Sequence, residues 1–348
     1  MLSDNFVMVG DPHFGIKNDH SHWLQRMLNY WSENIFPYAR TNGVKQILIM
    51  GDFFDRRRFA NFETLEKMLN VFSPVTDEFE IYCLVGNHDI YWRDSLSVIG
   101  PKLTEFGNLF NWVVEPEIHG HKILVPWITK ENKDSILKLL STHSDKPSTD
   151  VFGHFESTGF EVVPGIPSHG NVSPALFKDY RNVYSGHFHQ RQKNGNMFYV
   201  GTPYELNRSD RGTAKGFFHY VDGSLREIPN PNPWFIRIDW KDGMSIADFT
   251  PSQITGNDVD VFVGIERDPV HFEEFVKALE NLSPLSLSVN TIVTHRSEML
   301  DLSVLASIED NLTLLNVYVD EMVKNPDQQK NTKTLIADLY QRASTDDE

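Results

Sequence analysis

Short apolar runs alternate with longer amphipathic segments through the first third of the chain. The runs FVMV, QILIM and IYCLV each end at a glycine, and their length is typical of buried strands. The amphipathic segments between and after them predict helices at residues 22–43, 62–72 and 95–106. This alternation predicts βαβ connections, in which helices join successive strands.

The pattern shifts toward strands from Asn111 onward. The runs NWVVE and KILVPW predict strands, a helix is expected near residues 130–140, and strands ending at His154 and His187 follow. Four later runs, MFYVGTP, GFFHYVD, SLREI and WFIRIDW, predict three or four antiparallel strands separated by turn residues. Two sheets packed face to face between helices would accommodate all of them, in an α/β (α+β) fold.

A connector rich in Pro and Asn, IPNPNP at residues 228–233, predicts a hinge. After it, the strand VDVFVGIE, the helix PVHFEEFVKALENL and the strand LSLSVNTIV predict an α/β cap that is too small to be readily stable on its own. We therefore expect a large first domain at residues 1–233, a cap at 234–298 and a C-terminal helical segment at 299–348.

The C-terminal segment carries an apolar stripe over residues 305–322, with members three and four positions apart. Such a stripe is typical of a helix that packs against another helix. The sequence NPDQQKNTK interrupts it, and TLIADLYQRAS predicts a second short amphipathic helix. Two arrangements fit: docking onto the chain's own first domain, or packing against helices of a partner.

Composition and charge bear on the partners and the compartment. The formal net charge of −16 argues against non-specific binding to nucleic acid, because Lys and Arg supply most of such affinity. The run Arg56, Arg57 and Arg58 fits either a solvated surface or a basic lip beside an acidic metal pocket. The single Cys83 is expected in the core, as suits a reducing compartment. Because no run approaches the roughly 18 apolar residues of a membrane span, we expect a cytoplasmic protein.

Candidate metal ligands follow strand-ending glycines at five places. The pairs are Gly10-Asp11, Gly51-Asp52, Gly86-Asn87, Gly153-His154 and Gly186-His187. Glycine at a strand end lets the backbone turn sharply and lie close to a neighbouring loop or ion. Each ligand would then follow the carboxyl end of its strand, where open α/β sheets usually bind their ligands. Segments far apart in the sequence are therefore expected to meet at one site.

Two further histidines extend this set toward two metal ions. His13 and His189 lie two positions after Asp11 and His187, and residues so spaced on an extended segment face the same way. Asp, Asn and His without a thiolate suit cations such as Mn, Mg, Fe or Zn. Two ions about 3.5–4 Å apart can clamp the attacking and leaving oxygens of a phosphoryl displacement, and Asp52 is the candidate to bridge them.

The sequence Asn87-His88-Asp89 suggests an acid beside the metals. Asn87 can bind a metal through its carbonyl oxygen, which leaves His88 to meet the phosphate and protonate the leaving oxygen. Asp89 is expected to accept the other ring N–H of His88 and so to fix its tautomer. A role for His88 as a plain neighbour of the metal stays open.

Five motifs, GDPHFG, GDFFDRR, GNHD, the GH of FGHFE, and GHFH, resemble in order and spacing those of the calcineurin-like metallophosphoesterases. More narrowly, YVGTPYELN, the SHG at 168–170 and the PW at 126–127 make the chain similar to the SbcD-type DNA repair nucleases, which include nuclease subunits of T4-like bacteriophages. The resemblance spans nearly the whole chain and is strongest through about Asn207. It implies a two-sheet sandwich flanked by helices, with a small DNA-binding cap and a C-terminal helical segment.

The resemblance also implies the layout of the metal site, with two divalent ions per chain. Mn is expected in preference to Mg. Their ligands would be Asp11, His13, Asp52 and His189 for one ion, and Asp52, Asn87, His154 and His187 for the other. His88 would be catalytic and Asp89 would support it. Archaeal and eukaryotic relatives carry a histidine at the position of Asp55, so no second catalytic imidazole is expected here.

The same resemblance implies 3′-to-5′ exonuclease and single-strand endonuclease activity in DNA recombination, repair and replication. The C-terminal segment would bind the base of the coiled coil of an SbcC-type ATPase subunit. Since the chain has no G-x-x-x-x-G-K-[ST] motif, that partner would handle ATP. A homodimer would form through the predicted helices at 62–72 and 95–106, although their apolar residues equally suit a core.

Two other functions stay open at this level. A phosphodiesterase or phosphatase of the same superfamily would act on a substrate other than DNA. Phosphatase relatives usually have Arg then Gly after the second motif and Glu after GNH, whereas this chain has Asp55-Arg56-Arg57 and Asp89. A non-catalytic scaffold would have lost ligands, and none of the expected set is missing.

Overall fold

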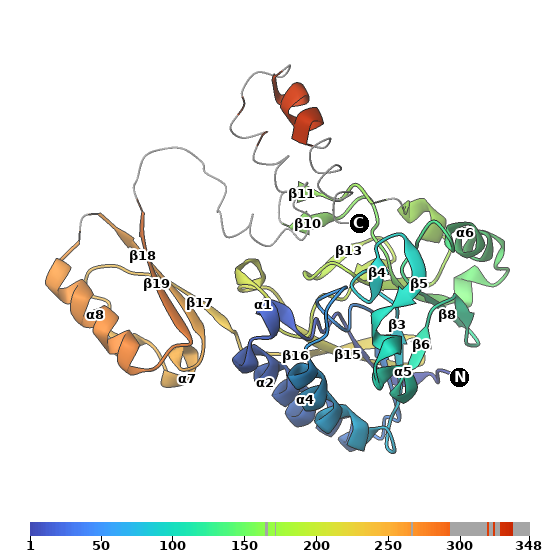
Figure 1. Ribbon diagram of the computed structural model, residues 1–348, viewed down its shortest axis with the longest axis horizontal. Coiled ribbons are helices and arrows are strands. Elements are labelled where there is room, and N and C mark those ends of the chain that lie inside the picture. Colours follow the sequence, from blue (N-terminus) through green and yellow to red (C-terminus); the bar gives the residue numbers. More distant parts are fainter. Residues whose placement is uncertain are drawn as a thin grey trace.

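Two six-stranded sheets form the centre of the computed structural model, and a smaller sheet lies to one side (Figure 1). The structure describes residues 1–163, 166–170, 172–265, 267–292, 319, 323 and 328–336. The predicted helical stripe at 305–322 therefore lies outside the described residues, except at Val319. Within the described part, no helix has both the length and the apolar character needed to cross a membrane.

The first sheet joins the first three predicted strands with a later hairpin. Its order is β16 (Ser224–Pro229), β15 (Gly216–Val221), β1 (Asn5–Val9), β2 (Gln46–Ile49), β3 (Glu80–Leu84) and β6 (Asn111–Val113). Strands β1, β2, β3 and β6 are parallel, and β15 pairs antiparallel with β1. The predicted βαβ wiring therefore places the ends of β1, β2 and β3 at the same edge.

The second sheet carries the remaining two ligand-bearing strands at its centre. Its order is β13 (Gln192–Asn194), β14 (Met197–Tyr199), β12 (Asn182–Gly186), β9 (Asp150–His154), β8 (Lys122–Val125) and β7 (Glu117–Ile118). The four inner strands are parallel, and only the two edge strands run antiparallel. This parallel centre differs from the expected antiparallel pairing of the MFYVGTP strand, since β14 runs parallel to β12.

The two sheets pack face to face, as predicted, through one apolar layer. Phe6 of β1 lies edge-on to Phe152 of β9, with ring centroids 5.5 Å apart, and Phe152 stacks on Tyr184 of β12. Alternate residues of the same strands point outward and pack under helices, so both sheets are buried on two faces. Cys83 is one of these outward residues and is buried in the core, as expected.

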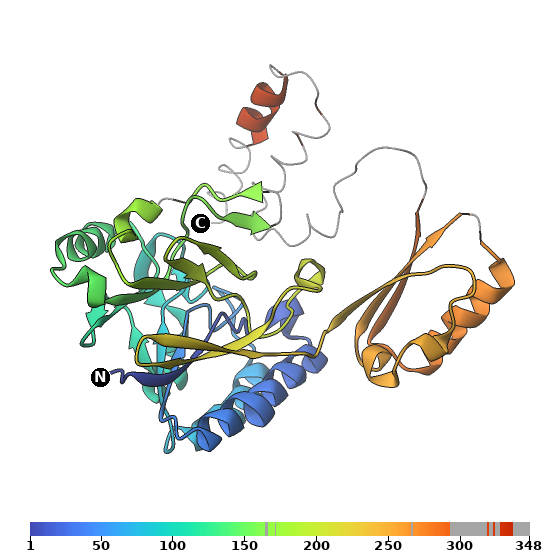
Figure 2. The same ribbon diagram turned by 180° about the vertical axis from the view of Figure 1, so that it is seen from behind.

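Helices cover the outer faces of the sandwich (Figures 1 and 2). Those on the first sheet are α2 (Ser21–Tyr30), a π-helical turn (Trp31–Ile35), α3 (Phe36–Thr41) and α4 (Phe62–Phe72). On the second sheet lie α6 (Lys133–Thr142) and a 3-10 turn (Pro174–Phe177). The long helix predicted at 22–43 is thus present but widened just before Pro37, whose ring cannot continue a regular α-helical ladder.

The helix predicted at 95–106 is wrong. The segment begins with strand β5 (Ser95–Ile99), which pairs with β4 (Ile90–Trp92) in a hairpin. A 3-10 turn (Gly100–Leu103) and the single helical turn α5 (Phe106–Leu109) follow. Gly100 and Pro101 interrupt a helical path, and the pairing of Ile99 with Ile90 favours the extended form.

The smaller sheet contains β17 (Phe235–Asp239), β18 (Asp258–Gly264) and β19 (Ser286–Ile292), with α7 (Pro251–Ile254) and α8 (Pro269–Asn281). All three strands are parallel, so the expectation that the WFIRIDW run joins an antiparallel set is also wrong. The unit has its own apolar cluster under α8. It contacts the sandwich through Arg208 and Asp260, 2.8 Å apart, and through Phe235 stacked on Trp23. The domain boundaries 1–233, 234–298 and 299–348 stay a prediction.

Candidate metal centre

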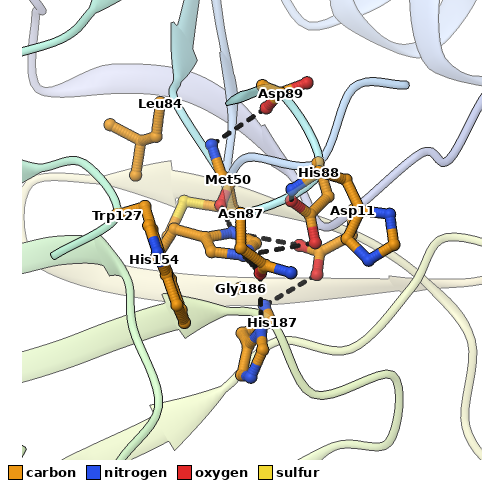
Figure 3. A network of polar contacts seen from close by, with 12 residues as sticks. Asp11, Met50, Leu84, Asn87, His88, Asp89, Trp127, His154, Gly186 and His187 are labelled. Carbon is orange, nitrogen blue, oxygen red and sulfur yellow. Dashed lines mark hydrogen bonds and ion pairs between the residues drawn. The ribbon is translucent and has the colours of Figure 1, made fainter. Parts of the chain in front are cut away.

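The ligands of the five glycine–ligand pairs meet at one site, and Figure 3 labels four of them, Asp11, Asn87, His154 and His187. Loops after β1, β2 and β3 bring the side chains from the first sheet, and the ends of β9 and β12 bring those from the second. The structure thus gathers all seven expected ligands, although they span most of the first 189 residues. They are Asp11, His13, Asp52, Asn87, His154, His187 and His189.

Asp52 lies between two groups of these side chains. Its Oδ2 atom is 3.3 Å from Nε2 of His154 and 3.8 Å from Nε2 of His13. Its Oδ1 atom accepts the backbone N–H of His88 at 2.7 Å, which fixes the carboxylate in this orientation. One oxygen of Asp52 therefore faces histidines of both groups, and the bridging role expected for this carboxylate stays a prediction.

Asn87 is the meeting point of the second group. Its Oδ1 atom lies 3.1 Å from Nε2 of His154 and 2.9 Å from Nδ1 of His187. Nδ1 of His154 donates to the carbonyl oxygen of Met50 at 2.7 Å, so Nε2 is the nitrogen left facing Asp52 and Asn87. Asp52, His154 and His187 each offer one ligand atom within 4.8 Å of the others.

The first group surrounds Asp11 and His13. Nε2 of His13 lies 3.2 Å from Nε2 of His189. One oxygen of Asp11, Oδ2, accepts the backbone N–H of His187 at 2.7 Å, whereas Oδ1 is buried with no hydrogen-bond partner among the described residues. A buried carboxylate oxygen without a partner is costly, and a cation in front of it removes that cost. The side chains around Asp52 therefore fit a metal centre, and they include two groups that could each hold an ion: His13, Asp52 and His88, and Asp52, His154 and His187.

The backbone is strained at three of the ligands. His13, Asp52 and His187 have φ angles of 50°, 48° and 90°, a left-handed region that side chains other than glycine rarely adopt. Such strain concentrates at functional sites, where the surrounding structure enforces it.

Two of the preceding glycines are required by space. A Cβ atom on Gly51 would lie 2.2 Å from Nδ1 of His154, and one on Gly86 would lie 2.2 Å from Oδ1 of Asp52. Glycine therefore lets one ligand approach the backbone that carries another.

Buried charge dominates the electrostatics of the centre. Burial raises the pKa of Asp11. Burial alone would lower the pKa of His154, but the charges of Asp52 and Asp11 raise it to about 9. Burial alone would raise the pKa of Asp52, but the charges of His154 and His88 bring this pKa well below its ordinary value. The protein thus places negative charge where only protons or metal ions can balance it.

His88 lies beside the centre, and its partner differs from the predicted one. Nδ1 of His88 bonds to the backbone carbonyl oxygen of Asp55. The carboxylate of Asp89 instead accepts backbone N–H groups, from Phe53 and Phe54 on one oxygen and from Gly86 on the other. Since Nδ1 of His88 bonds to Asp55, the expectation that Asp89 accepts this ring N–H and fixes the tautomer is wrong. One nitrogen of His88 also lies within 4.8 Å of ligand atoms of His13 and Asp52.

Sequence reasoning missed the groups that hold the ligands in place. Asp55 has Oδ1 3.4 Å from Nδ1 of His13. The buried amine of Lys215 donates to the backbone oxygen of His189 at 2.8 Å, to Thr202 and to Asp210. Asp55 appeared in the sequence only as a departure from relatives, and Lys215 lies directly before β15 with no pattern that marks it.

The three arginines after the second motif each have a partner. Arg57 donates to the backbone oxygen of Asn87 at 2.8 Å, and Arg56 pairs with Asp19. The guanidinium of Arg58 lies 5.0 Å from the ring of Tyr91. All three line a cavity of about 1210 Å³ that also reaches His88, so they form a basic rim beside the centre.

Comparison with known proteins shows the family to which the chain belongs. The model of the family called calcineurin-like phosphoesterase matches residues 5–191, a range that holds all seven expected ligands. The chain is 27% identical over 323 residues to exonuclease subunit 1 of Enterobacteria phage T4, over 90% of this chain and 91% of that protein. It is also similar to the crystal structure of a Pseudomonas putida nuclease, MPE, with 13% identity and a TM-score of 0.30, over 64% of this chain and 87% of the other.

Proposed function

Since the chain belongs to the calcineurin-like phosphoesterase family, we propose that it is a DNA nuclease dependent on two divalent metal ions. The metal proposed is Mn, with Mg as the second choice. The observation that carries the proposal is the position of Asp52 between two groups of ligands, with the unpartnered Oδ1 of Asp11 beside them. Ordinary structural histidines do not gather around buried carboxylates in this way. Family membership itself establishes a metal-dependent phosphoesterase, and DNA as the substrate is the further step.

The choice of DNA is supported by a relative that covers nearly the whole chain. That relative is named an exonuclease subunit of phage T4 and aligns with 90% of this chain, which is far more than the phosphoesterase region at residues 5–191. The activity proposed is 3′-to-5′ exonuclease together with single-strand endonuclease, in DNA recombination, repair and replication. The compartment proposed is the cytoplasm of a host bacterium.

The chemistry is divided between the ligands and His88. Bound divalent ions would supply an activated water and neutralise charge on the scissile phosphate. The role of the seven ligand side chains is to hold those charges in fixed positions. The role of His88 is to protonate the leaving oxygen through Nε2, since its Nδ1 bonds to the backbone of Asp55. Asp89 fixes the loops that present Asn87 and His88.

We further propose two protein partners. The T4 relative is named a subunit, which supports a complex, and we propose an SbcC-type coiled-coil ATPase that binds the segment 299–348. We also propose a homodimer through α4 and the neighbouring 3-10 turn. Phe62 and Leu103 are 87% and 78% exposed there and line the same cavity, which supports an apolar contact.

Cleavage of end-labelled single- and double-stranded DNA tests the proposal. Wild-type protein should cleave with Mn or Mg and lose activity in chelator. The variant His88→Gln should bind as much Mn as wild type, while turnover falls roughly 100- to 10,000-fold, because it lacks the acid. The control His121→Gln removes an exposed histidine on the second sheet's side and should cleave normally.

Three outcomes would count against parts of this proposal. Hydrolysis of a nitrophenyl phosphodiester without any cleavage of DNA would favour the phosphodiesterase or phosphatase alternative. Loss of Mn binding in His88→Gln would make His88 a ligand and not an acid. Wild-type protein with neither bound Mn nor activity would support a non-catalytic scaffold.

A further inference from the structure

We infer that Glu156 is a positioning residue for the metal ligand His187, with Arg93 and Ser168 holding its carboxylate in place. This inference rests on the proposed metal centre and adds a residue outside the seven ligands. Glu156 follows the His154 motif by two positions, and neither the motif nor the expected ligand set assigns it a task.

The orientation of the His187 ring carries the first step. Nδ1 of His187 faces Asn87 Oδ1 at 2.9 Å and is therefore the nitrogen turned toward the centre. Nε2 lies on the opposite side of the ring, 3.8 Å from Oε2 of Glu156. The ring stands between Asn87 and Glu156, so the carboxylate faces the outer nitrogen of a ligand and not the metal position.

This arrangement has a defined chemical effect. With a metal on Nδ1, the ring proton would lie on Nε2, and a carboxylate beside that nitrogen would make Nδ1 a stronger donor. Two neighbours fix the orientation of the ring, whose backbone is itself left-handed with φ of 90°. Trp127 lies against the ring at a tilt of 43°, with ring centroids 5.2 Å apart, and Glu156 lies 3.8 Å from Nε2 at its edge.

Glu156 is itself fixed by segments that are distant in the sequence. The hydroxyl of Ser168 donates to Oε1 at 3.1 Å, and Arg93 from the β4–β5 hairpin lies 3.5 Å from Oε2. The backbone N–H of Gly170 bonds to the same Ser168 hydroxyl at 3.0 Å. A Cβ atom on Gly170 would lie 2.3 Å from the carbonyl oxygen of Glu156. The SHG sequence at 168–170 therefore forms a close-fitting support for Glu156.

Glu156 has more contacts than the carboxylate of a surface ion pair. Arg93 and Ser168 lie on one side of its carboxylate, and His187 lies on the other. Its side chain is largely shielded, with 21% of its area exposed, whereas Arg93 is 47% exposed. A carboxylate that only served Arg93 would gain little from this exposed pair. The contact with His187 accounts for this half-buried position of the carboxylate.

Titration of the full chain with Mn, followed by electron paramagnetic resonance and calorimetry, tests the inference. In Glu156→Gln the shape stays and the charge is lost, so one of two Mn ions should bind roughly 10- to 100-fold more weakly while the other is unchanged. The matched control is Glu117→Gln, because Glu117 pairs with His119 at 2.8 Å on an edge strand of the same sheet. It should bind both ions as wild type does.

The outcomes separate this inference from the proposed function. Unchanged affinity for both ions in a folded Glu156→Gln protein overturns the role of Glu156 and leaves the metal centre standing. Two bound ions in wild type without DNA cleavage overturn the nuclease proposal and leave Glu156 as argued. Wild-type protein that binds no Mn overturns both. If Glu156→Gln does not fold, Ser168→Ala removes one support of the carboxylate and should weaken the same ion several-fold, and no change there also overturns the inference.

Discussion

At the scale of single residues, the hydrogen bond from His154 to Met50 decides which nitrogen serves the centre. Nδ1 is committed to the Met50 carbonyl oxygen, so Nε2 must lose its proton before it binds a metal. Asp52 and Asp11, against the effect of burial, raise the pKa of His154 to about 9. Without metal, the ring therefore carries its proton at neutral pH and acts as the counter-charge of the carboxylates.

This proton makes metal affinity and stability depend on pH in opposite directions. Between pH 6.5 and 9 a binding ion displaces the His154 proton, so Mn affinity should rise by up to about tenfold per pH unit and level off above pH 9. The pKa of His154 is about 6.5 in the unfolded protein and about 9 in the folded protein, so protonation of this ring stabilises the folded state fully below pH 6.5. This contribution to stability is lost as pH rises through about 9. The metal-free protein should therefore melt at a lower temperature at pH 9 than at pH 6.5.

Calorimetry in two buffers of different ionisation enthalpy checks the first part, because it counts the protons released per ion. Thermal melts with and without chelator check the second. An Mn affinity that is flat across this range, with no proton released, would show that His154 is neutral in the metal-free centre.

At the scale of elements, the sequence predicts structure well wherever the local pattern of a segment is sufficient to specify it. The bounds of α4 match the prediction residue for residue, and β1, β2 and β3 end where the glycines indicated. The segment 95–106 misled because Leu96, Ile99, Leu103 and Phe106 have helical spacing, while its real partner is the strand β4. The direction of β17 was equally hidden, since β18, its parallel neighbour, comes later in the chain.

The same limit applies to the centre. Ligand types and their order are visible in five short motifs, but the contacts that orient them are made with residues far away. Met50 lies 104 positions from His154, and Lys215 lies 26 positions from His189. Asp89 shows the consequence, because its place after His88 suggested a ring contact and its oxygens serve the main chain instead.

The main-chain contacts of Asp89 predict an effect on stability and not on the titration of His88. Asp89 ties the loop after β2 to the loop after β3, and Asp89→Asn would turn an N–H group toward at least one of its donors. Leaving such a buried donor unsatisfied costs about 1–3 kcal/mol, measurable by chemical denaturation. Asp239→Asn is the matched control, because Asp239 is an exposed member of an ion pair. A shifted pH profile of turnover with unchanged stability would restore the contact between Asp89 and His88.

At the scale of the whole molecule, the net charge of −16 and a DNA substrate agree only if positive charge is concentrated at the site. Bound metal ions supply part of it, and the basic rim of Arg56, Arg57 and Arg58 supplies more. The rim borders the same cavity as the exposed Phe62 and Leu103. A homodimer formed there would therefore set two active sites close to its shared interface.

Oligomeric state measured by light scattering tests that arrangement. Each buried Phe or Leu contributes about 1.5–3 kcal/mol, so Phe62→Glu with Leu103→Glu should weaken the dimer at least about 100-fold and give a monomer at micromolar concentration. Both side chains lie outside the ligand set, so Mn binding should persist. Val270→Glu, a change of another exposed apolar residue on α8, should leave the dimer intact. A wild-type protein that is already monomeric at tens of micromolar would remove the dimer, and Phe62 and Leu103 would then need another partner to account for their exposure.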